Sequence, residues 1–459
     1  MPAKMTASAA MTARLDALPA YVRNELSVLP DLLNAAADLS SAEAAATILG
    51  LLGDAQFYGL PAPPAGQPQF PQSHLMHLDL SNEWYWLSAN LTASDGVTRI
   101  GVLVDMHSWR MLSQAVQAQA GWTDEECQVV NNAVTVVIAN AEGSRIVRRA
   151  PNTCWKIGGD AVVFPTPEAF IFRCGEDVLT GGSNQVLPLR AQINDGERLI
   201  LDLTFSTDMA AKDAFFLQGF GGVTPAPRAG VYYSWPQLTV RGSVQVDGQA
   251  YEVSGTGWID HQLIMAPPPA DAPPPPTPVP KFPLNETSEQ FGDWQWCQFN
   301  FDNGDAYTGV TFQGGPFRVD LASPYGYYLR RQDGAWNTEL VVGSWSLDAF
   351  IATLFGVVQP TAWTMNAVSL VSAGQPFDVN LTIMPQPWHP DGSFVLGDQS
   401  IASEVPVTVA AINRQIPGQL PGGIMTGTGY CETVGAEIRA NYQARALAFL
   451  ASQPPRPVD

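Results

Sequence analysis

The chain has 459 residues, of which 46% are hydrophobic and only 14% are charged, and its formal net charge is −20. Because there is no basic stripe to neutralise phosphates, the composition argues against nucleic-acid binding and against strong binding to anionic membranes. The length exceeds what one compact core usually holds, so two domains are expected. A neutral, apolar small molecule is the partner that such a chain accommodates most easily.

Residues 1–70 are predicted to form a helical N-terminal appendage that ends in a Pro-rich linker. Apolar residues recur at helical spacing between Leu15 and Leu29, and Ser40 with Glu43 resembles a capping box in front of a second helix. We expect this appendage to cover the end of a barrel or to make a homodimer contact. No apolar stretch suits a secretory signal or a membrane span, so a cytoplasmic location is expected.

The pattern becomes β from residue 71 onward. Short runs rich in Val, Ile, Phe, Tyr and Trp are separated by dipeptides that favour the positive φ of tight hairpins. These dipeptides are Asp95-Gly96, Asp195-Gly196, Asp247-Gly248, Asn303-Gly304, Asp333-Gly334 and Asp391-Gly392. The sequence therefore predicts a mainly β protein: a first β-domain over 71–265, a Pro-rich linker or lid over 266–290, and a second β-domain with a C-terminal helix over 291–459.

The stretch from Val253 to Gln262 is the strongest candidate for a site. It reads as a strand, in which alternation places Trp258 and Asp260 on one face and His261 on the other. A carboxylate beside an indole and next to one of only five histidines fits an acid–base site. The ordinary alternative is an Asp that caps a turn and a Trp that fills a core.

A second strand, from Asp293 to Phe301, alternates between two kinds of side chain. One face carries Trp294, Trp296, Gln298 and Asn300. A face that mixes indoles with amides suits the wall of a ligand cavity better than a dry core. His74, His77 and Asp79 lack a convincing pattern for a metal site, and no nucleotide-binding glycine motif occurs, so neither a metal nor a cofactor is expected.

Several motifs, taken together and in order, resemble the lipocalin-like family of carotenoid 1,2-hydratase, also called hydroxyneurosporene synthase. That family is similar to kievitone hydratase and to lipocalin-fold Diels–Alderases. The motifs are Glu83-Trp84-Tyr85-Trp86, Tyr232-Tyr233-Ser234-Trp235-Pro236, Gly255 to Gln262, Asp293-Trp294 and Gly427-Thr428-Gly429-Tyr430-Cys431-Glu432. The resemblance implies two consecutive lipocalin-like antiparallel β-barrels that act on an apolar isoprenoid-like or polyketide-like molecule.

Alkene hydration needs a strong proton donor, because protonation of carbon creates a carbocation. A buried Asp can stay protonated near neutral pH, and aromatic faces stabilise a nearby cation. We therefore predict Asp260, His261 and Trp258 as catalytic residues. The predicted substrate-binding residues are Trp84, Trp86, Tyr233, Trp294, Trp296, Gln298, Glu83, Tyr430 and Glu432.

The sequence leaves several functions open. The leading hypothesis is a lyase that hydrates an alkene or dehydrates a tertiary alcohol, and loss of a different proton would make it an isomerase. A pericyclase would use the barrel to orient a polyene and would need no proton donor. A carrier of an apolar metabolite would do no chemistry at all.

Overall fold

The computed structural model describes fourteen stretches of the chain. They are residues 70–79, 82–110, 117, 121–141, 143–156, 159–182, 185–217, 232–264, 293–313, 325–352, 358–369, 378–385, 402–413 and 424–434. The predicted N-terminal helices, the Pro-rich linker or lid over 266–290 and the C-terminal helix lie outside these residues. In the parts of the chain that are described, no helix has the length and apolar character needed to cross a membrane.

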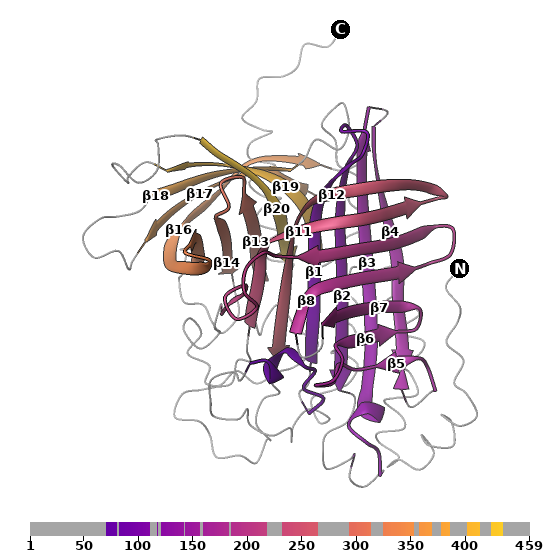
Figure 1. Ribbon diagram of the computed structural model, residues 1–459. Helices are drawn as coiled ribbons and strands as arrows, with labels where there is room; N and C mark the ends of the chain where they lie inside the picture. The colour runs from indigo at the N-terminus through magenta and orange to yellow at the C-terminus, as the bar shows by residue number, and fades with distance from the viewer. Residues whose placement is uncertain are drawn as a thin grey trace. The chain divides into compact units, whose positions relative to one another are not determined.

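The chain divides into two compact units, Met1–Glu286 with Gln332–Trp336 and Thr287–Arg331 with Asn337–Asp459. The first unit holds a twelve-stranded antiparallel sheet (Figure 1). Its strands are β1 (Asn82–Ala93), β2 (Arg99–Arg110), β3 (Gln128–Asn140), β4 (Gly143–Trp155), β5 (Val162–Val163), β6 (Ile171–Cys174), β7 (Asp177–Gly182), β8 (Gln185–Asn194), β9 (Leu199–Ser206), β10 (Phe216–Leu217), β11 (Tyr232–Val246) and β12 (Gln249–Ile264). Two short 3-10 turns, Gln72–His74 and Glu125–Cys127, precede β1 and β3.

The second unit is a closed barrel of eight antiparallel strands in sequential order. Its strands are β13 (Asp293–Phe301), β14 (Ala306–Gln313), β15 (Tyr325–Gln332), β16 (Ala335–Ala352), β17 (Val358–Ser369), β18 (Asp378–Pro385), β19 (Ala402–Asn413) and β20 (Ile424–Val434). Together the two units confirm the predicted mainly β, lipocalin-like fold.

The hairpin turns follow from local sequence chemistry. Five glycines of the turn dipeptides have the predicted positive φ, and each lies in the turn between two consecutive strands. They are Gly96, Gly196, Gly248, Gly304 and Gly334. In two-residue turns both central residues have positive φ, at Asp247-Gly248 and at Asp333-Gly334. That geometry matches the twist of the flanking strands. Asp391-Gly392 lies outside the described residues.

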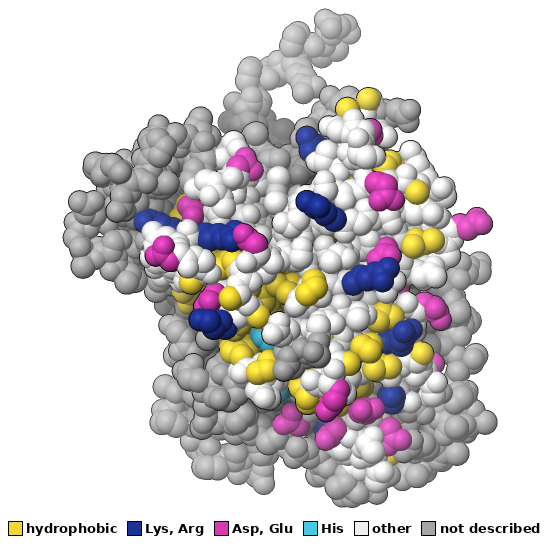
Figure 2. Space-filling view, in the orientation of Figure 1, with side chains coloured by type: hydrophobic (Ala, Val, Ile, Leu, Met, Phe, Trp, Pro, Cys, Tyr) yellow, Lys and Arg dark blue, Asp and Glu magenta, His cyan; other side chains and the backbone are white. Residues whose placement is uncertain are grey.

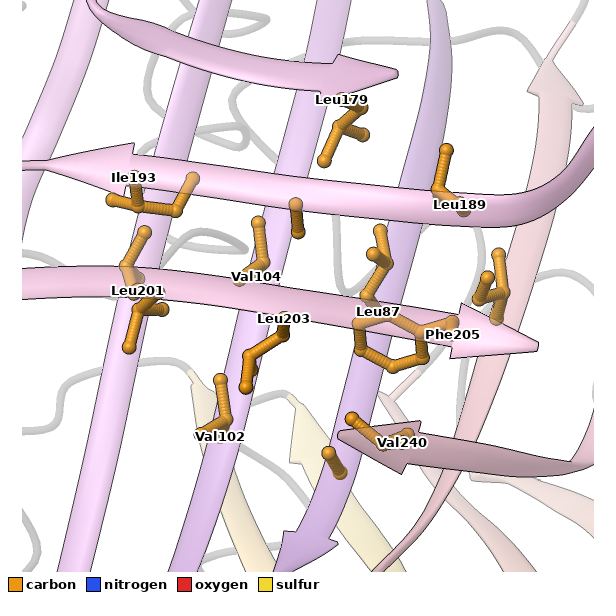
Figure 3. Close-up of a cluster of buried hydrophobic side chains, with 14 of the residues drawn as sticks. Leu87, Val102, Val104, Leu179, Leu189, Ile193, Leu201, Leu203, Phe205 and Val240 are labelled. Carbon is orange, nitrogen blue, oxygen red and sulfur yellow. The ribbon is translucent and has the colours of Figure 1, made fainter. Parts of the chain in front are cut away.

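The core of the first unit lies between strands that cross over one another (Figure 1). Strand β9 alternates strictly between buried and half-buried side chains, and its Leu201, Leu203 and Phe205 face the core. Figure 3 shows these side chains pointing toward Leu87 and other aliphatic residues of the strands behind them. Each fully buried side chain of this kind stabilises the fold by about 1.5–3 kcal/mol. Aliphatic and aromatic side chains therefore fill much of the inner side of the sheet.

A buried ion pair joins the two ends of the first sheet. In the strand order, β4 lies at one end and β7 near the other, and Arg149 on β4 contacts Asp177 on β7 with nitrogen–oxygen distances of 2.6 and 2.7 Å. Asn132 and Asn152 each donate a further hydrogen bond to Asp177 at 3.1 Å. The fully buried carboxylate thus has a partner for each of its oxygens, which offsets its desolvation.

On the face drawn in Figure 2, the Lys and Arg side chains of the described residues are scattered among Asp and Glu and form no continuous basic stripe. This mixed distribution agrees with the negative net charge of the chain.

Candidate functional site

Strand β12 is a central strand that is buried on both faces where it carries Asp260. Its partners are β1 on one side and β11 on the other, and Asp260 is paired with Trp86 and with Ser234. Trp258, Ile259, Asp260 and His261 are all buried. The predicted strand and the alternation of its side chains are confirmed, and Asp260 does not cap a turn.

Gly257 shows why this strand needs a residue without a side chain. A Cβ atom at this position would lie 2.5 Å from Val240 Cγ2 and 2.8 Å from Phe205 Cε1. Both neighbours belong to the hydrophobic core, so they have little room to move. The backbone of β12 therefore packs closely against Val240 and Phe205 at this position.

Asp260 accepts hydrogen bonds from three neutral donors. Trp258 Nε1 donates to Oδ1 at 2.6 Å, Ser234 Oγ donates to the same oxygen, and Tyr232 donates its hydroxyl proton to Oδ2 at 2.8 Å. Burial raises the pKa of Asp260 from 3.8 to about 7, although these three hydrogen bonds oppose the shift. Asp260 is therefore a carboxyl group that is partly protonated near neutral pH.

A β-bulge in β11 follows directly after the strand positions that carry Tyr232 and Ser234. The pairing of β11 with β12 shifts between Trp235 and Leu238, and Gln237 has a φ of 54°. Pro236 has no backbone N–H to give to a ladder, which suits it to such a position. The extra residue keeps both Trp235 and Leu238 in the core.

Three tryptophans share the face of Asp260. Register places Trp86 directly beside Asp260, Trp84 beside Gln262, and Ser88 beside Trp258. Trp258 is fully buried, Trp86 is buried and Trp84 is half-buried. The structure therefore brings together Asp260 and three of the predicted aromatic residues, which supply faces that could stabilise a cation.

His261 points to the opposite face of β12, away from Asp260. Its Nε2 lies 2.7 Å from Glu83 Oε1, its Nδ1 lies 2.5 Å from the Tyr233 hydroxyl, and its ring stacks on Tyr85 at a centroid distance of 4.0 Å. Burial lowers the pKa of His261, although Glu83 opposes this shift. Of the predicted residues, His261, Glu83 and Tyr233 thus form a network of their own, and direct contact of these three with a substrate at Asp260 stays a prediction.

The segment before β1 joins this second network. His74 Nδ1 lies 2.9 Å from the Tyr233 hydroxyl, and His77 Nδ1 lies 3.0 Å from Glu83 Oε1. Burial alone would raise the pKa of Glu83, but the charge of His77 and the hydrogen bonds from His261 and His77 lower it to about 2. Glu83 is therefore an anion that ties the segment before β1 to the sheet.

The remaining predicted residues belong to the second unit. Trp296, Gln298 and Tyr430 are buried, and register pairs Gln298 with Tyr430. Trp294 and Glu432 lie on β13 and β20, but their side chains are outside the described residues. A role for these five residues in binding substrate stays a prediction.

Sequence reasoning missed Tyr232 and Ser234 as partners of Asp260. The signal was present, because alternation places both residues on one face of a strand and Tyr233 on the other. What the sequence lacked was the pairing of Ser234 with Asp260, a contact across 26 positions in the chain.

The raised pKa of Asp260 predicts how stability depends on pH. The folded state holds this proton more tightly than the unfolded state, so the stabilising contribution is complete below about pH 4 and is lost as the pH rises to about 7. A difference of about three pKa units corresponds to about 4 kcal/mol. We expect urea unfolding from pH 4 to 8 to show a steeper decline in the free energy of unfolding for the wild type than for Asp260→Asn. Parallel curves would contradict the raised pKa.

The fold and the site define a class: an antiparallel, lipocalin-like β protein with a buried acidic group beside aromatic rings. The AttH-like family model matches residues 61–315, which is more than half of the chain. The chain therefore belongs to the AttH-like family. The narrower resemblance to carotenoid 1,2-hydratase goes beyond what this match shows.

Three solved structures are similar to this chain over 82–83% of its length. A putative AttH from Nitrosomonas europaea is 17% identical with a TM-score of 0.53, and the alignment covers 82% of this chain and 99% of that one. Kievitone hydratase from Nectria haematococca is 13% identical with a TM-score of 0.45, covering 83% and 97%. CghA is 9% identical with a TM-score of 0.44, covering 83% and 96%. A comparison with curated protein sequences finds no match.

Proposed function

We propose that the protein is a hydro-lyase that adds water to an apolar, isoprenoid-like alkene, or removes water from the corresponding tertiary alcohol, with Asp260 as the general acid. The observation that carries the proposal is the state of Asp260: it is 4% exposed, bonded to three neutral donors, and has a pKa of about 7. A carotenoid end group is one member of this substrate class.

The chemistry follows from the site. The protonated carboxyl group of Asp260 transfers its proton to the less substituted alkene carbon, and the positive charge develops on the more substituted carbon. The indole faces of Trp86 and Trp258 stabilise that charge, by about 2 kcal/mol or more when water is excluded. The three hydrogen-bond donors then stabilise the carboxylate that remains. In dehydration the same groups act in reverse order.

The proposal is tested with the purified full-length protein and defined probes. Limonene and α-terpineol form an alkene–alcohol pair, and linalool serves as an open-chain alcohol. In deuterated water we expect the wild type to place deuterium on the protonated carbon and to interconvert alkene and alcohol. Absence of both isotope exchange and interconversion on all three probes, under conditions in which they bind, would contradict acid catalysis.

The Ser234→Ala substitution tests the link between the hydrogen bonds and the acid. Loss of one donor to the carboxylate removes about 1.5 kcal/mol of stabilisation of the charged form, so the pKa of Asp260 should rise by about one unit. Because the protonated form is the active one in hydration, the rate should persist to a pH about one unit higher. The pH profile of hydration measures this shift.

Ser88→Ala is the matched control for that experiment, since Ser88 is a buried serine on the same face and is paired with Trp258. The Ser88→Ala variant should have the same pH dependence of hydration as the wild type. An equal displacement in both variants would show that the shift does not report the Ser234 hydrogen bond.

A further inference from the structure

Strand β2 places a second pair of polar side chains on the face that carries Asp260. Trp86 on β1 is paired with Asp260 on one side and with Asp105 on the other, so the three side chains form one row across β12, β1 and β2. Residues directly opposite one another in antiparallel strands point to the same face. Two strand spacings put the Cα atoms of the two aspartates about 10 Å apart, with the Trp86 indole between them.

His107 follows Asp105 by two positions on the same strand and therefore shares its face. Its Nδ1 lies 3.1 Å from Asp105 Oδ1, a close contact that lacks the alignment of a hydrogen bond. Its ring lies 5.1 Å from the ring of Trp84, to which it is paired by register. Asp105 and His107 are 3% and 7% exposed, so this polar pair is buried next to the tryptophans of the site.

The burial of this pair needs a physical explanation. A buried carboxylate and an imidazole on a face rich in indoles cost several kcal/mol of desolvation, and an apolar pair would pack without that penalty. Burial also lowers the pKa of His107 to about 3, so its imidazole is neutral in the near-neutral range in which Asp260 is partly protonated. A neutral imidazole does not compete with Asp260 for the proton that hydration requires.

We propose that His107 is the base that takes the proton from the attacking water, and that Asp105 is a positioning residue that orients His107 and stabilises its charged form. This role rests on the proposed function, and it assigns the residues that deprotonate the attacking water. Asp260 supplies the proton on one side of the Trp86 indole, and water is deprotonated on the other. The arrangement suits an extended alkene that lies across Trp86, with its less substituted carbon toward Asp260.

The proton balance of the step is complete. The alkene takes a proton from Asp260 and becomes a carbocation, and a water oxygen forms the new C–O bond. The resulting oxonium passes its extra proton to the His107 imidazole, which faces the Asp105 carboxylate. The imidazolium then returns one proton to the Asp260 carboxylate through solvent, so the net reaction is alkene plus water to alcohol. An oxonium is so strong an acid that even an imidazole of low pKa accepts its proton.

Two isotopes separate the two halves of the site in a single assay. Limonene is incubated with the wild type and with His107→Ala in deuterated water that also carries a heavy oxygen isotope. Without the base, the cation still forms, but it returns to alkene by losing a proton. We expect His107→Ala to retain deuterium exchange into the alkene while incorporation of heavy oxygen into α-terpineol falls by about 100-fold. Asp105→Asn should lower the same ratio of oxygen to deuterium incorporation by about tenfold.

Rescue and a matched control distinguish a chemical role from a structural one. Added imidazole should restore oxygen incorporation in His107→Ala but not in Asp105→Asn, where the native ring is still present. His77→Gln changes a histidine before β1 that contacts Glu83 on the opposite face of the sheet, and it should keep the wild-type ratio. Equal loss of both isotopes in His107→Ala, or an unchanged ratio, would overturn the role of His107 while wild-type turnover leaves the proposed function standing. A wild type that processes no probe would contradict both.

Discussion

Asp260→Asn is expected to lower hydration and dehydration by about 10³–10⁴-fold, toward the upper end of what a positioned general acid contributes. The amide has the size of the carboxyl group but no acidic proton. Its oxygen can accept from Trp258 and Ser234, and its nitrogen can donate to the Tyr232 hydroxyl, so every present partner keeps a hydrogen bond. The loss should therefore appear in the rate and leave the folded state intact.

The same substitution distinguishes the classes of function. A pericyclase that works by orientation would keep most of its rate in Asp260→Asn, and a carrier would keep its binding and have no rate to lose. Asp202→Asn serves as the control, because Asp202 is a carboxylate at the surface that pairs with Arg190. The Asp202→Asn variant should have the same reaction rates as the wild type. Initial rates on limonene and α-terpineol, together with a circular dichroism spectrum of each variant, decide the outcome.

Asp177→Ala is expected to lower the free energy of unfolding by about 3–5 kcal/mol, the usual effect of removing one partner from a buried ion pair. The substitution leaves the Arg149 guanidinium buried without its counter-charge, and it removes the acceptor for Asn132 and Asn152. Because Asp177 joins strands from opposite ends of the sheet order, the loss also weakens the closure of the first unit.

The surface pair Arg190–Asp202 offers a matched comparison. It has the same chemistry and a similar nitrogen–oxygen distance of 2.6 Å, but both side chains are more than a third exposed. Asp202→Ala should change stability by about 1 kcal/mol or less. Urea unfolding of Asp177→Ala and Asp202→Ala measures the loss in the free energy of unfolding that each substitution causes. If the two substitutions have equal effects, the buried pair does not stabilise the closure of the sheet.

The fold was largely predictable because its signals are local. Alternation along β12 placed Trp258 and Asp260 on one face and His261 on the other, and the glycines of five turn dipeptides have the positive φ that tight hairpins require. These properties depend on a residue and its immediate neighbours in the chain. The mainly β class and the hairpins between neighbouring strands could therefore be predicted without knowledge of the sheet order.

The composition of the site could not be predicted in the same way, because cross-strand register brings distant residues together. Alternation alone could not reveal that Tyr232 and Ser234 hold Asp260, or that Asp105 lies across Trp86 from it. His261 stands next to Asp260 in sequence, yet its partner is Glu83, at a separation of 178 positions. A carboxyl pKa of about 7 likewise arises from burial on a central strand, which depends on every layer that excludes water from it. The sequence alone thus singled out Asp260 as the candidate acid, whereas the tertiary structure decided its proton affinity and its neighbours.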